Sequence, residues 1–106
     1  TIECNVTSQF EQHLRTILNL PPGSTRIVQP GVMINLLGEK GFEGNAVYRN
    51  LEEAMAIPGV KTHIYGKAQT KSFRKMGHVT IVAEKLEDAK NTGRKIKNLI
   101  RVESNL

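Results

Sequence analysis

The stretch VKTHIYGKAQTKSFRKMGHVTIVA, residues 60–83, contains two runs of apolar and β-branched residues on either side of a polar segment. Runs of four to eight such residues, bounded by turn-forming residues, are typical of β-strands. We therefore predict strands in residues 60–67 and 76–83. Because a polar turn joins them, the two strands should pair as antiparallel neighbours, which indicates an antiparallel sheet.

The segment before this pair carries signals for a helix at residues 8–19. Ser8 can accept a hydrogen bond from a free backbone N–H while Glu11 reaches back, an arrangement called a capping box. The run Pro21-Pro22-Gly23 prevents the helix from continuing. The apolar residues of this helix share one face at helical spacing: Phe10, Leu14, Ile17 and Leu18.

A second apolar run, VMINLL at residues 32–37, indicates a buried strand that ends at a glycine-rich loop. Glycines at positions 38, 41 and 44 form this loop. They do not match a phosphate cradle, because no Gly-Lys-Ser/Thr sequence follows them and no helix is signalled behind them.

Two more helices are predicted in the second half of the chain. Asn50 and Glu53 have capping-box spacing and open a short helix that Pro58-Gly59 ends. From Glu84 to Ile100 the apolar residues keep helical spacing, with acidic residues early and basic residues late, as the helix dipole favours. We expect this closing helix to cover one side of the sheet.

A chain of 106 residues corresponds to one domain with a modest core. The predicted elements make it an α+β protein. The composition is ordinary for a protein in water, at 39% hydrophobic and 24% charged residues, with no run long enough to span a bilayer and no apolar leader. We expect a cytoplasmic protein without membrane or nucleic-acid partners. Because the chain opens at Thr1 without methionine, we interpret it as a piece of something longer.

The positive charge of the chain is concentrated between the two central strands. Residues 61–78 contain five Lys or Arg residues and no Asp or Glu, which accounts for the whole net charge of +5. An excess confined to one hairpin favours a compact anionic ligand over diffuse contact with nucleic acid. A hairpin brings Lys67 beside Arg74 and Lys75, and three cations can anchor the three oxygens of a phosphate monoester.

Other interpretations of these residues stay open. The basic turn could be a solvated surface that discourages edge-to-edge pairing, or it could belong to a noncatalytic nucleic-acid-binding module, for which it offers only Tyr65 and Phe73 as stacking residues. The three histidines lack the spacing of a metal site, so we predict no metal bound by this chain. We find no self-contained catalytic set.

Three motifs, TSQFEQHLRTILNLP, VMINLLG and HIYGKAQTKSFRKMGH, resemble in order and spacing the C-terminal part of the 5-(carboxyamino)imidazole ribonucleotide synthase family. These ATP-grasp enzymes of purine biosynthesis, also described as the ATPase subunit of phosphoribosylaminoimidazole carboxylase, use ATP and bicarbonate to carboxylate 5-aminoimidazole ribonucleotide. Thr1 matches the last residue of an Asn-Ser-Gly-His-x-Thr motif. The resemblance implies that ATP and magnesium bind to an upstream part, that no catalytic residue lies here, and that this piece is inactive alone.

The resemblance also implies a domain division and a set of site residues. Residues 1–24 would end the ATP-grasp domain, and residues 25–106 would form a small antiparallel domain, barrel-like or sandwich-like, closed by a C-terminal helix. Related ribonucleotide enzymes hold the substrate's 5'-phosphate with the lysine of a Tyr-Gly-Lys motif and a basic pair seven and eight residues later. Those positions are Lys67, Arg74 and Lys75, with Gln9, His13 and His78 expected behind them.

Two questions remain from the resemblance. Where the family usually reads Arg-Pro-Gly, this chain has Lys71-Ser72-Phe73, which alters the turn but leaves the anchoring positions in place. The formate-dependent glycinamide ribonucleotide transformylase has a comparable ending, although Gln9 and His78 favour the carboxyaminoimidazole enzyme. Homodimerisation, through apolar surface that another domain normally covers, is an open alternative.

Overall fold

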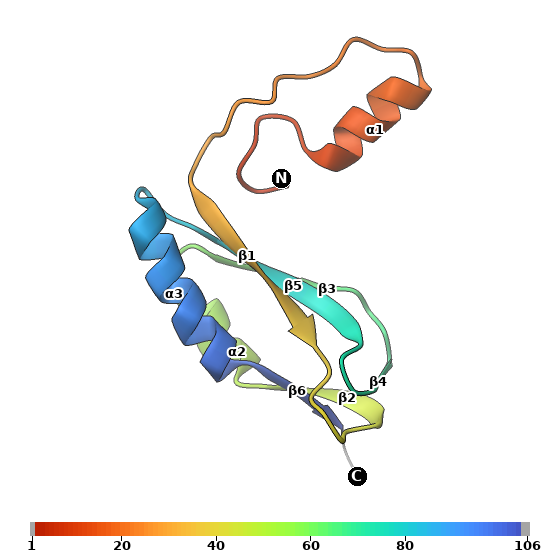
Figure 1. Cartoon of the computed structure of the whole chain (residues 1–106), viewed down its shortest axis with the longest axis vertical. Coiled ribbons are helices and arrows are strands. Elements are labelled where there is room, and N and C mark those ends of the chain that lie inside the picture. Colours follow the sequence, from red (N-terminus) through yellow and green to blue (C-terminus); the bar gives the residue numbers. More distant parts are fainter. Residues whose placement is uncertain (1, 105–106) are drawn as a thin grey trace.

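The computed structural model describes residues 2–104, which form an elongated molecule with two small β-sheets, a long helix packed against the first sheet, and an N-terminal helix that lies apart from both sheets (Figure 1). The elements, in order, are α1 (Gln9–Ile17), β1 (Gly31–Leu37), β2 (Gly44–Arg49), α2 (Leu51–Met55), β3 (Val60–Ile64), β4 (Gln69–Thr70), β5 (Lys75–Val82), α3 (Leu86–Leu99) and β6 (Arg101–Ser104).

The first sheet has the order β1-β5-β3, with both pairs antiparallel. The predicted pairing of the strands in residues 60–67 and 76–83 is therefore confirmed, with Thr62 opposite Val79 and His63 opposite His78. Helix α3 packs on one face of this sheet, where a Cβ on Gly93 would lie 3.1 Å from Val32. The other face carries the histidines.

The second sheet has the order β4-β2-β6 and was not expected from the sequence. β2 pairs with β6 from Ala46 opposite Ser104 to Arg49 opposite Arg101, and with the short β4 at its other edge. The α+β class and the antiparallel pairing are confirmed. Since the strands form two separate sheets, the domain is sandwich-like and not a closed barrel.

The core lies where α3 meets both sheets. β5 contributes Val79 and Ile81, α3 contributes Ile96, and β6 contributes Val102, all at most 2% exposed. Burial of a side chain of this kind stabilises the fold by roughly 1.5–3 kcal/mol. The core therefore ties the second half of the chain together, whereas α1 contributes no buried residue.

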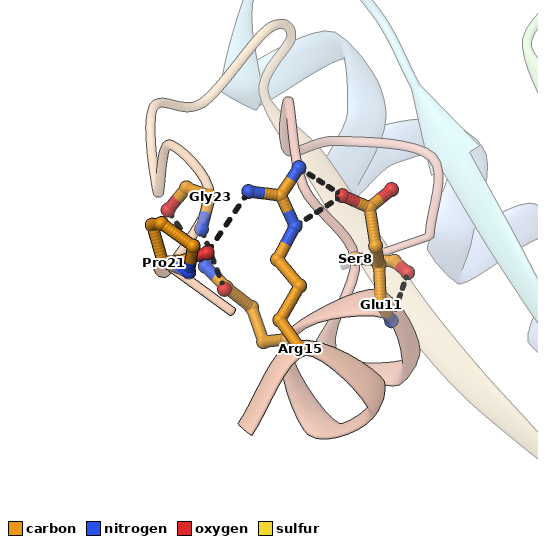
Figure 2. Close-up of polar contacts among 6 residues, drawn as sticks. Ser8, Glu11, Arg15, Pro21 and Gly23 are labelled. Carbon is orange, nitrogen blue, oxygen red and sulfur yellow. Dashed lines mark hydrogen bonds and ion pairs between the residues drawn. The ribbon is translucent and has the colours of Figure 1, made fainter. Parts of the chain in front are cut away.

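Helix α1 is capped and braced by its own neighbours (Figure 2). Ser8 Oγ accepts from the Glu11 N–H at 3.1 Å, so the predicted cap is confirmed, but the Glu11 carboxylate contacts Arg15 at 2.6 Å. Arg15 also donates to the Pro21 carbonyl at 3.2 Å. Gln12 exchanges two hydrogen bonds with the Gly23 backbone, at 2.8 and 2.9 Å. These contacts fold residues 18–23 against the polar face of the helix.

The structure corrects three sequence predictions. β1 is not buried throughout: it is an edge strand whose residues alternate, with Leu36 buried and Met33 61% exposed. Asn50 does not cap α2 with its side chain, because it adopts a left-handed conformation (φ 63°) and donates to the Leu99 carbonyl at 2.9 Å. The predicted closing helix is confirmed as α3, but it is not the last element, since β6 follows it. No helix in residues 2–104 is long and apolar enough to cross a membrane.

Candidate phosphate-binding hairpin

The basic segment connects β3 to β5 by way of the second sheet. The backbone N–H of Tyr65 donates to the Met76 carbonyl at 3.1 Å, which continues the β3–β5 pairing by one residue. The chain then leaves the first sheet, forms β4 against β2, and turns back at residues 71–74. The hairpin is therefore fixed at its base by one sheet and near its tip by the other (Figure 1).

The glycine-rich loop after β1 holds the tip of this hairpin. The Phe73 N–H donates to the Gly38 carbonyl, and the Gly38 N–H donates to the Arg74 carbonyl, both at 2.8 Å. The Gly41 N–H donates to Ser72 Oγ at 2.9 Å. The loop of residues 38–43 thus supports the basic turn, a role that glycine spacing alone did not reveal.

Two of the three predicted cations are fastened to backbone carbonyls of the hairpin. Lys67 Nζ donates to the Lys75 carbonyl at 2.8 Å, and Arg74 Nη1 donates to the Gln69 carbonyl at 3.1 Å. Within residues 2–104, neither these two side chains nor Lys75 forms an ion pair with a carboxylate. An ammonium has three donor hydrogens and a guanidinium has five, so donors remain for an anion.

The other predicted site residues lie apart from this hairpin or beside its base. Gln9 and His13 lie on or next to α1, at the opposite end of the molecule from β4 (Figure 1). The chain alone does not bring them to the cations. His78 lies in β5, and its ring contacts Tyr65, the residue that precedes the Gly66-Lys67 step. Lys67, Arg74, Lys75 and His78 thus share one region.

A row of aromatic and titratable side chains extends from this region to the N-terminal segment. Tyr65 Oη lies 3.0 Å from His78 Nδ1, and the His78 ring stacks on His63 with centroids 4.6 Å apart. His63 Nε2 lies 3.2 Å from a Glu3 carboxylate oxygen. Lys67 Nζ lies 5.8 Å from the centroid of the Tyr65 ring. The sequence did not predict this row, because it depends on the β3–β5 register.

Among the described residues, no group of three or more His, Cys, Asp or Glu side chains could hold a metal ion. The two stacked histidines have Glu3 as their acidic neighbour and do not form such a group. The side chains of this row can form hydrogen bonds, and they place titratable groups beside the cations.

The pKa of His78 is lowered from its ordinary value of 6.5. Partial burial is the largest cause, followed by the positive charge of His63, while Glu3 opposes the shift. Burial disfavours the charged imidazolium, and a like charge nearby acts in the same direction. At neutral pH His78 is therefore a neutral ring that can accept a hydrogen bond from Tyr65.

We expect this histidine to make the stability of the protein depend on pH. A group with a lowered pKa binds fewer protons in the folded state than in the unfolded state. Its contribution is therefore fully present above pH 6.5 and is lost as the pH falls through the folded pKa. Urea unfolding between pH 7.5 and 5 should show a falling midpoint in the wild type and a flatter profile in His78→Gln. His13→Gln, the control, should keep the wild-type slope, and identical slopes in all three proteins would refute the expectation.

A second prediction concerns the turn in which Phe73 has a positive φ of 63°. A left-handed conformation costs a residue with a Cβ about 1–2 kcal/mol, and glycine avoids this cost at a smaller entropic penalty. Because Phe73 is 65% exposed, replacing its side chain with a hydrogen loses little buried apolar surface. We expect Phe73→Gly to raise the free energy of unfolding by about 0.5–1 kcal/mol in urea titrations. Phe73→Ala keeps the Cβ and should give no gain, so equal stability of the two variants would contradict this account.

Comparison with known proteins supports the resemblance noted in the sequence. Residues 31–92 match the family described as the phosphoribosylaminoimidazole carboxylase C-terminal domain, which is more than half of the chain. The chain belongs to this family. The matched residues run from the start of β1 into α3 and include the whole basic hairpin.

Members of this family and solved structures of related enzymes resemble the chain over most of its length. It is 40% identical over 84 residues to the N5-carboxyaminoimidazole ribonucleotide synthase of Bacillus subtilis, covering 79% of this chain and 20% of that protein. The crystal structure of N5-carboxyaminoimidazole ribonucleotide synthetase from Thermotoga maritima matches 99% of this chain with a TM-score of 0.96 and 50% identity, over 29% of that chain. The chain thus spans less than a third of these relatives.

One solved relative carries a bound ribonucleotide. The N5-carboxyaminoimidazole synthase from Aspergillus clavatus, solved in complex with ADP and 5-aminoimidazole ribonucleotide, matches 92% of this chain and 26% of that chain, with a TM-score of 0.76 and 36% identity. None of the relatives named here is a transformylase. The sequence-based choice of the carboxyaminoimidazole family is confirmed.

Proposed function

We propose that this chain serves as the C-terminal part of an ATP-dependent carbon–nitrogen ligase that carboxylates 5-aminoimidazole ribonucleotide with bicarbonate, in the purine biosynthesis of the cytoplasm. Its own task is to hold the 5'-phosphate of the ribonucleotide through Lys67, Arg74 and Lys75. Family membership and the ribonucleotide complex of a relative support this proposal.

The observation that carries the proposal is a hairpin whose three cations form no ion pair with a carboxylate of residues 2–104. Lys67 and Arg74 are each oriented by one hydrogen bond to a backbone carbonyl, at 2.8 and 3.1 Å, and keep further donors. A phosphate monoester supplies close to two negative charges and three acceptor oxygens. Each charge-assisted hydrogen bond to it contributes about 1.5–3 kcal/mol, so two or three such bonds would make a strong anchor for the substrate.

This anchor acts on binding and orientation rather than on the bonds that change. The 5'-phosphate is remote from the amino group that receives the carboxyl group, so its contacts position the ribonucleotide without taking part in proton transfer. ATP, magnesium and bicarbonate would bind to the rest of the enzyme. Among residues 2–104, no three or more His, Cys, Asp or Glu side chains are grouped so that they could hold a metal ion.

The N-terminal helix belongs, in this proposal, to the preceding ATP-grasp domain, with the division near residue 24. Its polar face is occupied by residues of its own loop (Figure 2). Its apolar face is exposed by more than half at each position: Phe10, Leu14, Ile17 and Leu18. An apolar stripe of this kind normally packs against another element, and the remainder of a longer enzyme would provide one.

A chimaeric enzyme tests the proposal directly. The corresponding part of the Thermotoga maritima enzyme is replaced by this chain, which matches it over 99% of its length. We expect the chimaera to consume ATP and carboxylate 5-aminoimidazole ribonucleotide when bicarbonate is supplied. Formate in place of bicarbonate should give no product.

Two outcomes would overturn the proposal. A well-folded chimaera that binds ATP but does not carboxylate the ribonucleotide would show that this chain cannot serve as the missing part. Micromolar affinity of the chain for generic RNA, with the steep salt dependence of phosphate-backbone contacts, would instead favour a nucleic-acid-binding module.

A further inference from the structure

The face of the first sheet opposite α3 carries a continuous row of interacting side chains. His63 lies in β3, Tyr65 follows the strand directly in a one-residue extension of its pairing, and Lys67 lies beyond Gly66, whose φ of 76° ends the extended backbone. His63 and His78 are direct cross-strand partners. Side chains of such pairs lie close enough to interact, and here the two rings stack at 4.6 Å with an angle of 21° between their planes.

Each neighbouring pair in this row has a defined contact. Glu3 Oε1 lies 3.2 Å from His63 Nε2, and Tyr65 Oη lies 3.0 Å from His78 Nδ1. Lys67 Nζ lies 5.8 Å from the Tyr65 ring centroid, within the range in which an ammonium is attracted by an aromatic ring. The row therefore connects the N-terminal segment with the first cation of the hairpin.

We propose that Tyr65 and His78 are positioning residues that orient Lys67 for a phosphate monoester, and that His63 and Glu3 tie this arrangement to the N-terminal segment. The inference rests on the proposed phosphate site. It adds to that site the residues that hold the Lys67 side chain in position.

The ammonium of Lys67 has two contacts with neighbouring residues. The Lys75 carbonyl accepts one of its hydrogens at 2.8 Å, and the centroid of the Tyr65 ring lies 5.8 Å from Nζ. Lysine has a flexible four-carbon stem, so its rotamer entropy opposes a fixed position. Tyr65 is itself 48% exposed, so the hydrogen bond between its hydroxyl and His78 Nδ1 helps to fix the orientation of its ring.

His78 Nδ1 can accept a hydrogen bond from the Tyr65 hydroxyl only when the ring is neutral, and the surroundings of His78 favour that form. Partial burial and the charge of His63 lower its pKa, whereas Glu3 raises it. On β1 the residue paired with His78 is the uncharged Asn35. The described neighbouring segments carry these titratable and charged groups: Glu3 of the N-terminal segment, Lys61, His63 and Tyr65 of β3 and its extension, and Lys67 of the following connection.

Ribose 5-phosphate binding to the 106-residue chain tests this inference at pH 8, where the phosphate is a dianion. Titrations followed by amide NMR shifts give the Kd. We expect Lys67→Met to weaken binding about tenfold or more, and Tyr65→Phe, which removes only the hydroxyl, to weaken it about 3- to 10-fold. In a Lys67→Met background the Tyr65→Phe effect should disappear, since the hydroxyl acts through Lys67.

His78 supplies a second set of variants. His78→Phe should weaken binding as much as Tyr65→Phe, and His78→Asn, which retains an acceptor near the Nδ1 position, should restore part of the affinity. His13→Gln on α1 is the matched histidine control and should leave the Kd unchanged. Equal effects of Tyr65→Phe with and without Lys67 would overturn the positioning role, even where both variants are folded.

The outcomes separate this inference from the proposed function. If wild-type and Lys67→Met chains respond equally to ribose 5-phosphate, the phosphate site itself is wrong. If Lys67→Met weakens binding but Tyr65→Phe and His78→Phe do not, the site stands and the positioning role falls.

The contact between His63 and Glu3 can be tested by a separate measurement that needs no ligand. NMR titration of the histidine ring should show the pKa of His78 rising in His63→Gln, because a neighbouring positive charge is removed, and falling in Glu3→Gln, because a negative charge is removed. Shifts of the same sign in both variants, or none, would break the proposed link to the N-terminal segment.

Discussion

Lys67→Ala is expected to raise the KM for 5-aminoimidazole ribonucleotide about 10- to 100-fold in the chimaeric enzyme, with kcat changed much less. The variant removes an ammonium that is held 2.8 Å from the Lys75 carbonyl and has no carboxylate partner in the described part of the chain. A charge-assisted hydrogen bond contributes about 1.5–3 kcal/mol, and each 1.4 kcal/mol corresponds to a factor of ten. A contact made equally in ground and transition states affects KM rather than kcat.

Lys71→Ala is the matched control for this prediction. It removes the same charge from the tip of the same hairpin, at an exposed position that we do not place at the phosphate. Long-range attraction of the ribonucleotide to a basic surface would fall equally in both variants and would weaken with added salt. Equal KM values for Lys67→Ala and Lys71→Ala would therefore show that net charge matters and that a specific Lys67 contact does not.

The strands at the centre of the fold could be predicted because their sequence pattern is local. Residues 76–83 are rich in β-branched and apolar residues, and β5 is the central strand that contacts both β1 and β3. The position of the cations on one hairpin followed from that pairing. Helix α1 was predicted nearly to its observed limits for the same reason, since Ser8 and the proline pair mark its two ends.

The second sheet could not be predicted because its strands depend on distant partners. β2 begins at the third of three spaced glycines and has no fully buried residue, so its own pattern is weak. They form β2 because residues 101–104 pair with them across more than fifty positions of sequence. Asn50 shows the same limit: its spacing to Glu53 predicted a cap, but contact with the end of α3 determines its conformation.

The candidate site also has one part that could be predicted from the sequence and one part that could not. The cations could be identified from charge and from the family resemblance, since both depend only on residue type and spacing. The row from Glu3 to Tyr65 depends on the exact β3–β5 register, because a slip of one residue would place His63 and His78 on opposite faces. Of the residues expected behind the cations, His78 lies beside the hairpin base, whereas Gln9 and His13 lie on the distant α1.

Gly38→Ala should cause the largest loss of stability among the substitutions considered, about 2–4 kcal/mol in urea unfolding, and should also displace the basic turn. A Cβ at this position would overlap the Lys71 carbonyl oxygen and Thr70 Oγ1 and would lie 3.0 Å from the Lys71 carbonyl carbon. These atoms belong mostly to the backbone, so a rotamer change cannot relieve the overlap. The two backbone hydrogen bonds that Gly38 makes with Phe73 and Arg74 would lengthen or break.

Gly41→Ala separates this steric effect from the conformational freedom of glycine. Gly41 lies in the same loop with φ 89°, and no atom lies within 4 Å of the position of its absent Cβ. Its substitution should therefore cost only the left-handed penalty of about 1–2 kcal/mol, and ribose 5-phosphate affinity should change little. Gly38→Ala should weaken ribose 5-phosphate binding more than Gly41→Ala does, because Gly38 is hydrogen-bonded to Phe73 and Arg74 in the basic turn. If both alanine variants lost equal stability and equal affinity, close packing at Gly38 could not be what holds the cations in place.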